Sequence, residues 1–95
     1  MVESFDGLAR PRREPSAAWR VLDGEAVMVL PATGKVHTLN AVGTRFWELV
    51  DGERTMAQIV GEIASRFEAP TDQIDRDCQV FARELVERGL LTLAP

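Results

Sequence analysis

The side chains that most often carry out chemistry in proteins are few in this sequence, and their spacing forms no catalytic pattern. His37 is the only histidine and Cys78 the only cysteine among the 95 residues. No serine or cysteine stands in a motif that would pair it with His37 as a nucleophile. One histidine and one cysteine cannot complete a tetrahedral zinc site of the usual kinds. The sequence therefore predicts no enzyme, no metal site and no cofactor.

Acidic side chains are numerous but scattered. The chain carries 15 acidic and 11 basic side chains, for a net charge of -4. The carboxylates fall at expected helix ends and on the flanks of one helix, so they do not indicate a glycosidase-like pair. No glycine-rich phosphate-binding motif is present. The negative charge argues against a phosphate backbone as partner, and we expect no nucleic acid binding.

The composition is that of a single soluble globular domain. Hydrophobic residues make up 45% of the chain and charged residues 27%, which is ordinary for such a domain. No apolar run approaches the ~20 residues needed to span a bilayer, and the N-terminus lacks the pattern of a signal peptide. A single cysteine excludes an intrachain disulfide. We expect a cytoplasmic protein without membrane association, as a monomer or homodimer.

The first 17 residues differ in character from the rest. They contain two prolines and a basic cluster, Arg10, Arg12 and Arg13, with little apolar periodicity. These features predict a flexible N-terminal arm over residues 1–17, followed by one domain over residues 18–95. The arginines are interpreted as solvated side chains, with a docking patch as the alternative.

Three short strands are expected next. Residues 19–22 and 25–30 flank an Asp-Gly pair, the strongest short hairpin signal. Both faces of residues 25–30 are apolar, which is typical of a central strand or of one covered on two sides. A Pro-Ala-Thr-Gly turn returns the chain as a third strand over residues 35–39. The pattern predicts a three-stranded antiparallel meander, with Trp19 packed in the core or on a sheet face.

A first helix should begin after Asn40, whose side chain can cap it, and should be closed by Asp51-Gly52. A second helix is expected over residues 55–67, opened by a capping box at Thr55. Each has an apolar stripe at helical spacing. The stripe of the first is Val42, Phe46, Leu49 and Val50, and that of the second is Met56, Ile59, Val60, Ile63 and Phe67.

A third helix should be capped by Thr71 and end at Arg88-Gly89. Residues 90–93 are apolar and either pack back onto the domain or add a strand. The core stripe of the third helix is Ile74, Cys78, Phe81 and Leu85. Because Cys78 lies in the middle of this stripe, we expect a buried and inert thiol.

Strands followed by helices predict an α+β domain, winged-helix-like in topology, with the helices packed on one face of the sheet. A winged-helix DNA-binding regulator is one alternative. Residues 72–88, however, hold five carboxylates against three guanidinium groups, the wrong sign for a helix in the major groove. A structural or oligomerisation subunit that exchanges strands at the edge formed by the third strand is a second alternative.

The expected third strand leads directly into the helices and so could lie at an edge of the sheet. An edge strand presents unpaired N–H and C=O groups. With the third helix it could form a groove to which an extended peptide adds as a further strand. On physical grounds alone, Lys35 could equally be a charge that protects this edge.

The stretch LNAVGTRFWELVDGERTMAQIV, residues 39–60, resembles the central signature of the PqqD family. VMVLPATGKVHTL before it and FARELVERGLL after it also match, so the resemblance covers about residues 18–93. Members are small winged-helix-like peptide recognition elements, which bind the leader of a ribosomally made precursor peptide and present it to a modifying enzyme. In the namesake case that enzyme is a radical-SAM maturase of pyrroloquinoline quinone biosynthesis. The resemblance implies a non-catalytic peptide chaperone in that pathway or a related one.

The resemblance also implies where the leader binds. In the family it adds to the third strand and lies against the third helix. The matching strand positions are Lys35, Val36, His37, Thr38 and Leu39. On the helix we select Asp77, Val80, Phe81 and Glu84, together with Arg76 and Arg83 for acidic side chains of the leader. The flank of the helix that faces the strand is left open.

Overall fold

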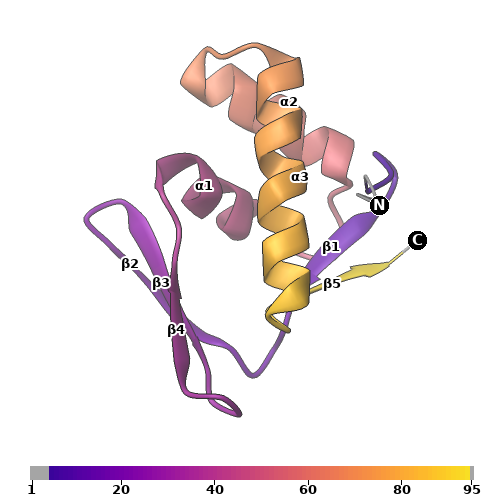
Figure 1. Ribbon diagram of the computed structural model, residues 1–95. Helices are drawn as coiled ribbons and strands as arrows, with labels where there is room; N and C mark the ends of the chain where they lie inside the picture. The colour runs from indigo at the N-terminus through magenta and orange to yellow at the C-terminus, as the bar shows by residue number, and fades with distance from the viewer. Residues whose placement is uncertain (1–4, 95) are drawn as a thin grey trace.

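The computed structural model describes residues 5–94, which form two small antiparallel sheets and three helices (Figure 1). The larger sheet has the strand order β2-β3-β4. Its strands are β2 (Ala18–Leu22), β3 (Glu25–Leu30) and β4 (Lys35–Thr38). The smaller sheet pairs β1 (Arg10–Arg13) with β5 (Leu91–Ala94). The helices are α1 (Ala41–Leu49), α2 (Met56–Phe67) and α3 (Thr71–Glu87).

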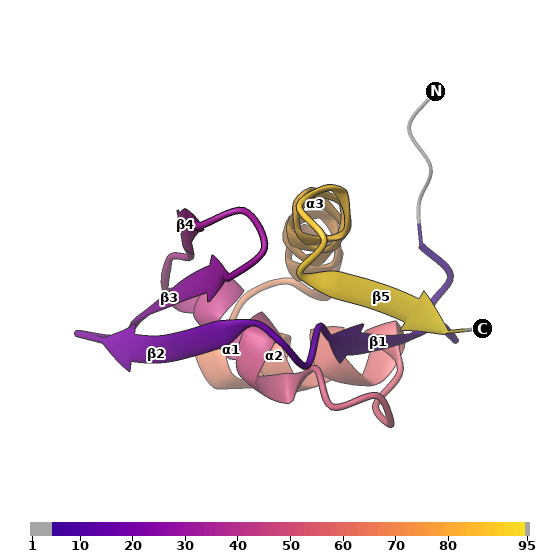
Figure 2. The same cartoon turned by 90° about the horizontal axis from the view of Figure 1, so that it is seen from below.

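The two sheets lie on either side of α3. Seen from below, β2, β3 and β4 form one group, and β1 with β5 lies on the other side of the molecule (Figure 2). The predicted α+β class and the three-stranded meander are confirmed. The winged-helix description holds only in outline, since the three-stranded sheet precedes all three helices.

The β2–β3 hairpin forms as predicted. Asp23 and Gly24 have φ angles of 52° and 79°, the left-handed conformations that a two-residue hairpin turn requires. Strand β3 is the central strand, one of the two alternatives that its apolar faces suggested; Ala26 and Met28 on one face are buried, and Val27 and Val29 on the other are half-buried. Strand β4 ends at Thr38, one residue earlier than predicted, although the N–H of Leu39 still donates to the C=O of Ala26 at 2.9 Å.

Local capping signals set the starts of α1 and α2. The Asn40 side chain accepts from the N–H of Gly43 at 2.8 Å, and the Thr55–Gln58 capping box forms in both directions. The predicted end of α1 was wrong by about two residues: the helix stops at Leu49, and the N–H of Val50 bonds to the C=O of Trp47.

Asp51 and Gly52 instead form the turn that follows α1. The Asp51 carboxylate accepts from the N–H groups of Glu53 and Arg54 at 2.9 and 2.8 Å. These hydrogen bonds lower the pKa of Asp51. An Asp-Gly pair can thus mark a side-chain-stabilised turn just beyond a helix as readily as the helix end itself.

Two predictions about the second and third helices were wrong. Thr71 does not cap α3 but is its first residue; Pro70 precedes it, and the Pro70 C=O accepts from Ile74 at 3.1 Å. Proline supplies the helical φ without a side-chain cap. Phe67 lies exposed at the end of α2, where the chain turns away through the left-handed Glu68.

The α3 stripe forms as predicted, with Ile74, Cys78 and Leu85 buried and Phe81 packed against the core. Burial, with added repulsion from Asp75 and Asp77, raises the pKa of Cys78 to about 12. The thiol is therefore protonated at neutral pH and shielded from reagents, as the sequence predicted.

Part of the predicted flexible arm has a fixed place in the fold. Residues 1–4 lie outside the described part, but Arg10–Arg13 form β1 and pair with β5. The other side of this segment meets the α1–α2 turn and the start of α2. There the carbonyls of Gly7, Ala9 and Pro11 accept from Ala57, Met56 and Gly52 at 3.0, 2.8 and 2.9 Å. Two orphan N–H groups of the first turn of α2 are satisfied in this way.

Arg13 ties β1 to α1 and β2. Its guanidinium donates to the C=O of Trp47 at 2.9 Å. The same group lies 5.0 Å from the ring of Trp19 and 5.8 Å from that of Trp47, and the two rings meet edge to face at 6.0 Å. Arg13 is thus a structural residue, in contrast to the solvated side chain that the sequence predicted.

Thr44 joins the larger sheet to α1. Among the described residues, Thr44 is the one polar residue that is buried, with 5% of its surface exposed. Its hydroxyl accepts from the N–H of Ala26 at 2.7 Å and donates to the C=O of Leu39 at 3.2 Å. The hydroxyl therefore completes the β3–β4 ladder at the point where β4 gives way to the helix.

We expect Thr44→Val to lower the free energy of unfolding by about 1–3 kcal/mol, because the Ala26 N–H would remain buried without an acceptor. Urea denaturation measures this change. Thr92→Val, at an exposed position on β5, is the matched control and should leave stability nearly unchanged. Equal effects of the two substitutions would contradict the role given to the hydroxyl.

We expect Arg13→Ala to cost about 1–2 kcal/mol, since it removes a charged hydrogen bond to a helix end and the contacts with two rings. Arg12→Ala, on the neighbouring exposed position of the same strand, serves as control. Tryptophan fluorescence during denaturation follows both variants, and the argument fails if Arg12→Ala proves the more damaging.

Candidate functional site

Strand β4 is an open edge of the larger sheet. In the described part of the chain it pairs with β3 on one side and with no strand on the other. Ladder bonds alternate along an antiparallel strand. The bond from Leu39 to Ala26 therefore directs the backbone groups of Lys35 and His37 toward β3. The N–H and C=O groups of Val36 and Thr38 face the open side.

Helix α3 lies along this open side, and its position depends on Phe81. A Cβ at Gly43 would lie 2.9 Å from the ring of Phe81 and 3.2 Å from the Cβ of Leu39. Only glycine lets the ring pack this closely on α1 and the end of β4. The Phe81 ring also lies 6.2 Å from that of Phe46. Phe81 therefore fixes the flank of α3 that faces β4.

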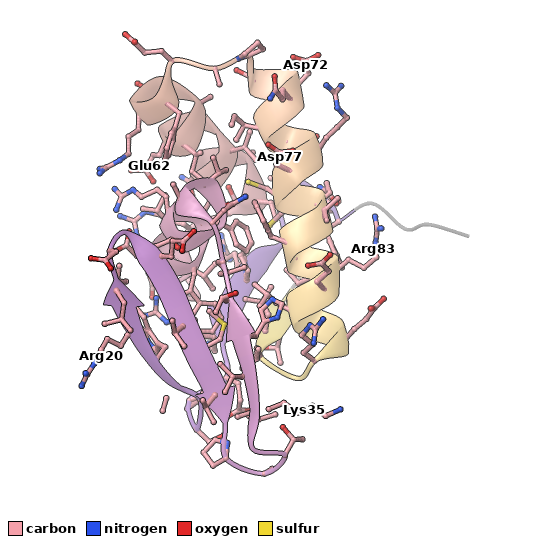
Figure 3. All side chains as sticks on the ribbon, turned by 60° about the vertical axis from the view of Figure 1, so that its left-hand side comes forward. Arg20, Lys35, Glu62, Asp72, Asp77 and Arg83 are labelled. Atoms are coloured by element: carbon pink, nitrogen blue, oxygen red, sulfur yellow. The ribbon has the colours of Figure 1, made fainter. Side chains whose placement is uncertain are left out.

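At 100° per residue, Asp77, Val80 and Glu84 fall within about 100° of Phe81 on the α3 surface. In Figure 3, Asp77 lies on the side of α3 that faces the sheet. The side chain of Val80 is entirely apolar, yet it is 45% exposed to solvent. This flank thus combines the carboxylates of Asp77 and Glu84 with the solvent-exposed apolar side chain of Val80.

Arg76 and Arg83 occupy the other side of the helix. They lie about 140–160° from Phe81 at the same helical spacing, and Figure 3 shows Arg83 directed away from the sheet. Arg76 lies 3.7 Å from Asp72 in an exposed ion pair. The structure therefore places Asp77, Val80, Phe81 and Glu84 on the flank of α3 that is turned toward β4 and the two arginines on the other side, but none of these six residues lines the groove between β4 and the end of α3.

A groove of about 210 Å³ lies between β4 and the C-terminal end of α3. Of the selected strand residues, Lys35, Val36 and His37 line it, and Val36 is 62% exposed. Leu39 is buried in the core and gives the groove no accessible side chain. The remaining lining residues are Leu30, Thr33, Glu87, Arg88 and Leu90.

Sequence reasoning missed the residues at this lower end of the groove. Arg88 was assigned only to the end of the helix, yet it stands four residues after Glu84 and seven after Phe81. That spacing places it on the same flank and could have identified it. Leu90 had no such signal, since it reaches the groove only because the chain turns back at Gly89, whose φ is 74°.

His37 lies on the strand side of the groove, and charged residues on the helix side change its pKa. Its Nε2 atom is buried without a hydrogen-bond partner. Burial lowers the pKa of His37, and the nearby Arg88 guanidinium lowers it further, whereas Glu84 acts in the opposite direction. His37 is therefore mainly neutral at neutral pH, and the mixed charges around it favour no single ligand charge.

Sequence comparison places this arrangement in a known family. Residues 25–91 match the model of the family described as coenzyme PQQ synthesis protein D (PqqD). The matched stretch contains β3, β4 and all three helices. The chain belongs to the PqqD family. The match begins after β1 and β2, so the contacts of Arg13 and the β2 edge lie outside it.

Two relatives are named as PqqA binding proteins. That of Rhizobium meliloti (strain 1021) is 27% identical over 70 residues, which are 74% of this chain and 69% of the relative. That of Gluconobacter oxydans (strain 621H) is 28% identical over 65 residues, which are 68% of each chain.

Two solved structures share the fold of this PqqD family member. TbiB1 in complex with the TbiA(β) leader peptide has a TM-score of 0.76 and 28% identity, covering 84% of this chain and 93% of that one. The PqqD part of Methylobacterium extorquens PqqCD, a stand-alone recognition element for ribosomally made, post-translationally modified peptides, has a TM-score of 0.72. At 21% identity, with coverage of 86% of this chain and 87% of that one, the second likeness shows the fold alone.

No helix among residues 5–94 is both long and apolar enough to cross a bilayer. No group of three histidine, cysteine or carboxylate side chains in this range is placed to hold a metal ion.

The assignment of the charges around His37 can be tested by titration. We expect Arg88→Gln to raise the pKa of His37, because a repulsive charge is removed, and Glu84→Gln to lower it further. The pH dependence of the His37 ring resonances measures both changes. Shifts of the same sign in the two variants would contradict the proposed surroundings.

The sign for stability follows from the lowered pKa. The unfolded chain binds a proton at His37 more readily than the folded chain, so His37 contributes stability above the unfolded pKa. That contribution declines as the pH falls through the folded value. Arg88→Gln should therefore reduce the loss of stability in mild acid relative to the unsubstituted protein, as urea denaturation across this pH range would show.

Proposed function

We propose that this protein is a peptide recognition element that binds the leader of a ribosomally made precursor peptide and presents it to a modifying enzyme. The observation that carries the proposal is the open β4 edge facing an exposed flank of α3. Membership of the PqqD family and the likeness to TbiB1, whose structure contains a leader peptide, support it.

In the proposed complex the leader adds to β4 as a fourth strand. The N–H and C=O groups of Val36 and Thr38 supply the backbone hydrogen bonds, which do not depend on sequence. Alternate side chains of the leader then point toward α3. Val80 and the exposed part of Phe81 give these side chains an apolar surface, and His37 lies beside them on the strand.

Charged residues would set the specificity at the two ends of the groove. Asp77 and Glu84 on the helix favour basic or hydrogen-bond-donating side chains of the leader. Lys35 and Arg88 lie at the other end of the groove and favour a carboxylate of the leader. Glu87 lies beside them, and its negative charge makes this preference weaker than that of two cations alone. Arg76 and Arg83 could meet the leader only if it continued over the outer side of α3.

The proposal assigns binding to this chain and chemistry to its partner. The partner would be a radical-SAM enzyme if the pathway leads to pyrroloquinoline quinone, or another modifying enzyme in a related pathway. Because the ligand would be a newly translated peptide, we place the protein in the cytoplasm. The DNA-regulator alternative has no comparable support, since α3 carries five carboxylates and two arginines.

Two substitutions test the two walls of the groove. We expect Val36→Pro to weaken binding of a synthetic leader, taken from the small peptide encoded beside the gene, by about tenfold or more, because it removes an edge N–H. Val21→Pro, at the edge of β2, makes the same change on the opposite side of the sheet and should not affect binding. Calorimetric titration measures both affinities.

Val80→Glu should likewise weaken binding by about tenfold or more, because the leader would bury a carboxylate. Val86→Glu is its matched control, since Val86 is 38% exposed on the other flank of the same helix. Circular dichroism checks that both variants fold. If Val86→Glu and Val21→Pro impaired binding as much as their counterparts, the leader would not occupy this groove.

A further inference from the structure

The larger sheet has a second open edge, on β2, where Arg20 is the single charged side chain. All five of its residues are exposed, including Trp19, Val21 and Leu22, of which Leu22 is 51% exposed. The strand AWRVL contains neither proline nor lysine, the residues with which proteins commonly blunt an edge. An exposed apolar edge of this kind is a template for pairing with another chain.

The backbone groups on this edge can be assigned. The two-residue turn makes Leu22 and Glu25 the closing hydrogen-bonded pair of the hairpin. The bonds alternate from there, so the N–H and C=O groups of Trp19 and Val21 point away from β3. In the described part of the chain no strand pairs with β2 on that side.

The outer side of β1 and the edge of β4 differ from the β2 edge. The outer side of β1 is occupied by the α1–α2 turn and the start of α2. Strand β4 begins with Lys35 and faces α3, so only a single strand that fits between them can add there. Within residues 5–94 no helix is interposed at the β2 edge, where Figure 3 shows Arg20 projecting outward, away from the helices.

We propose that β2 pairs antiparallel with β2 of a second copy of this chain, about a two-fold axis at Val21. In this register Val21 lies opposite Val21 of the second copy, and Arg20 lies opposite Leu22. The result is a continuous six-stranded sheet. Both β4 edges stand at its outer ends, so each copy keeps its groove open and the pairing is independent of the proposed peptide binding.

Charge complementarity favours a second copy at this register. Leu22 neighbours Glu25 across the hairpin on the same face as Arg20. The guanidinium of one copy therefore reaches over Leu22 toward the Glu25 carboxylate of the other, across two strand spacings, or about 9.6 Å. The two-fold axis repeats this pair. Both side chains are exposed, and neither has an ion-pair partner among the described residues.

A single pair of strands buries less than the ~1,200 Å² of a standard interface. The dimer should therefore be weak, and sedimentation velocity should show it only as the concentration rises toward the millimolar range. Amide exchange should slow with concentration at Trp19 and Val21 but not at Val36 and Thr38. This readout uses the unaltered protein and distinguishes the two edges.

Variants locate the interface. Val21→Pro removes an outward N–H without breaking the β2–β3 ladder and should abolish the dimer, whereas Val36→Pro should leave it intact. Arg20→Glu and Glu25→Arg each replace attraction by repulsion in both ion pairs and should weaken association by about tenfold. An equimolar mixture of these two variants should associate as the unsubstituted protein does, because each heterodimer regains both pairs.

Three results would overturn the proposal. The first is a protein that stays monomeric at all concentrations with unchanged exchange at Trp19 and Val21. The second is a dimer that Val36→Pro abolishes and Val21→Pro does not, which would place self-association at β4. The third is a dimer whose strength ignores Arg20→Glu and Glu25→Arg, which would exclude the register centred on Val21.

Discussion

The hydroxyl of Thr44 holds together the parts of the molecule on which the groove depends. The N–H of Leu39 donates directly to the C=O of Ala26, and the Thr44 hydroxyl supplies the return connection from the Ala26 N–H to the Leu39 C=O. Because Thr44 belongs to α1, the helix becomes part of the sheet's hydrogen bonding and cannot shift independently of it. Asn40 caps the same helix one residue before it begins. The edge of β4 therefore has a fixed position relative to the elements that pack on α1, which include α3.

The position of α3 follows from that attachment. Phe81 packs into the space left by the missing side chain of Gly43, so the helix is set by contact with α1 rather than by hydrogen bonds to β4. The gap between β4 and α3 is thus a consequence of core packing. A domain of this size would ordinarily close such a gap with side chains. Here Val36 and Val80 remain exposed on its two sides, which is the physical reason to assign the gap a ligand.

Features encoded by neighbouring residues could be predicted from the sequence. The Asp23-Gly24 turn, the Asn40 cap and the capping box at Thr55 each involve residues within a few positions of one another. The sequence left open whether residues 90–93 add a strand, which they do as part of β5. Their pairing with β1 could not be predicted, because Arg10 lies opposite Ala94, 84 positions away, and the Arg-Pro-Arg-Arg sequence of β1 shows no strand periodicity. Periodicity likewise placed Arg76 and Arg83 on the surface of α3 but could not tell which flank β4 would approach. That choice is made by Gly43, a residue whose importance is visible only once Phe81 lies against it.

The two edges of the larger sheet illustrate two ways in which an exposed strand can avoid non-specific pairing with other chains. Any exposed strand offers the same backbone groups, so hydrogen bonding alone cannot distinguish a ligand from another sheet. In the proposed complex the distinction at β4 is steric, because α3 would admit one extended chain and would exclude the second layer that a whole domain would bring. The side chains of that chain must also fit Val80, Phe81 and the charges beside them. At β2 there is no such barrier, and discrimination there must come from the side chains on the strand itself. Arg20 is the charged residue of β2, so the same side chain that repels its counterpart in a direct Arg20–Arg20 register can select the register in which it meets Glu25.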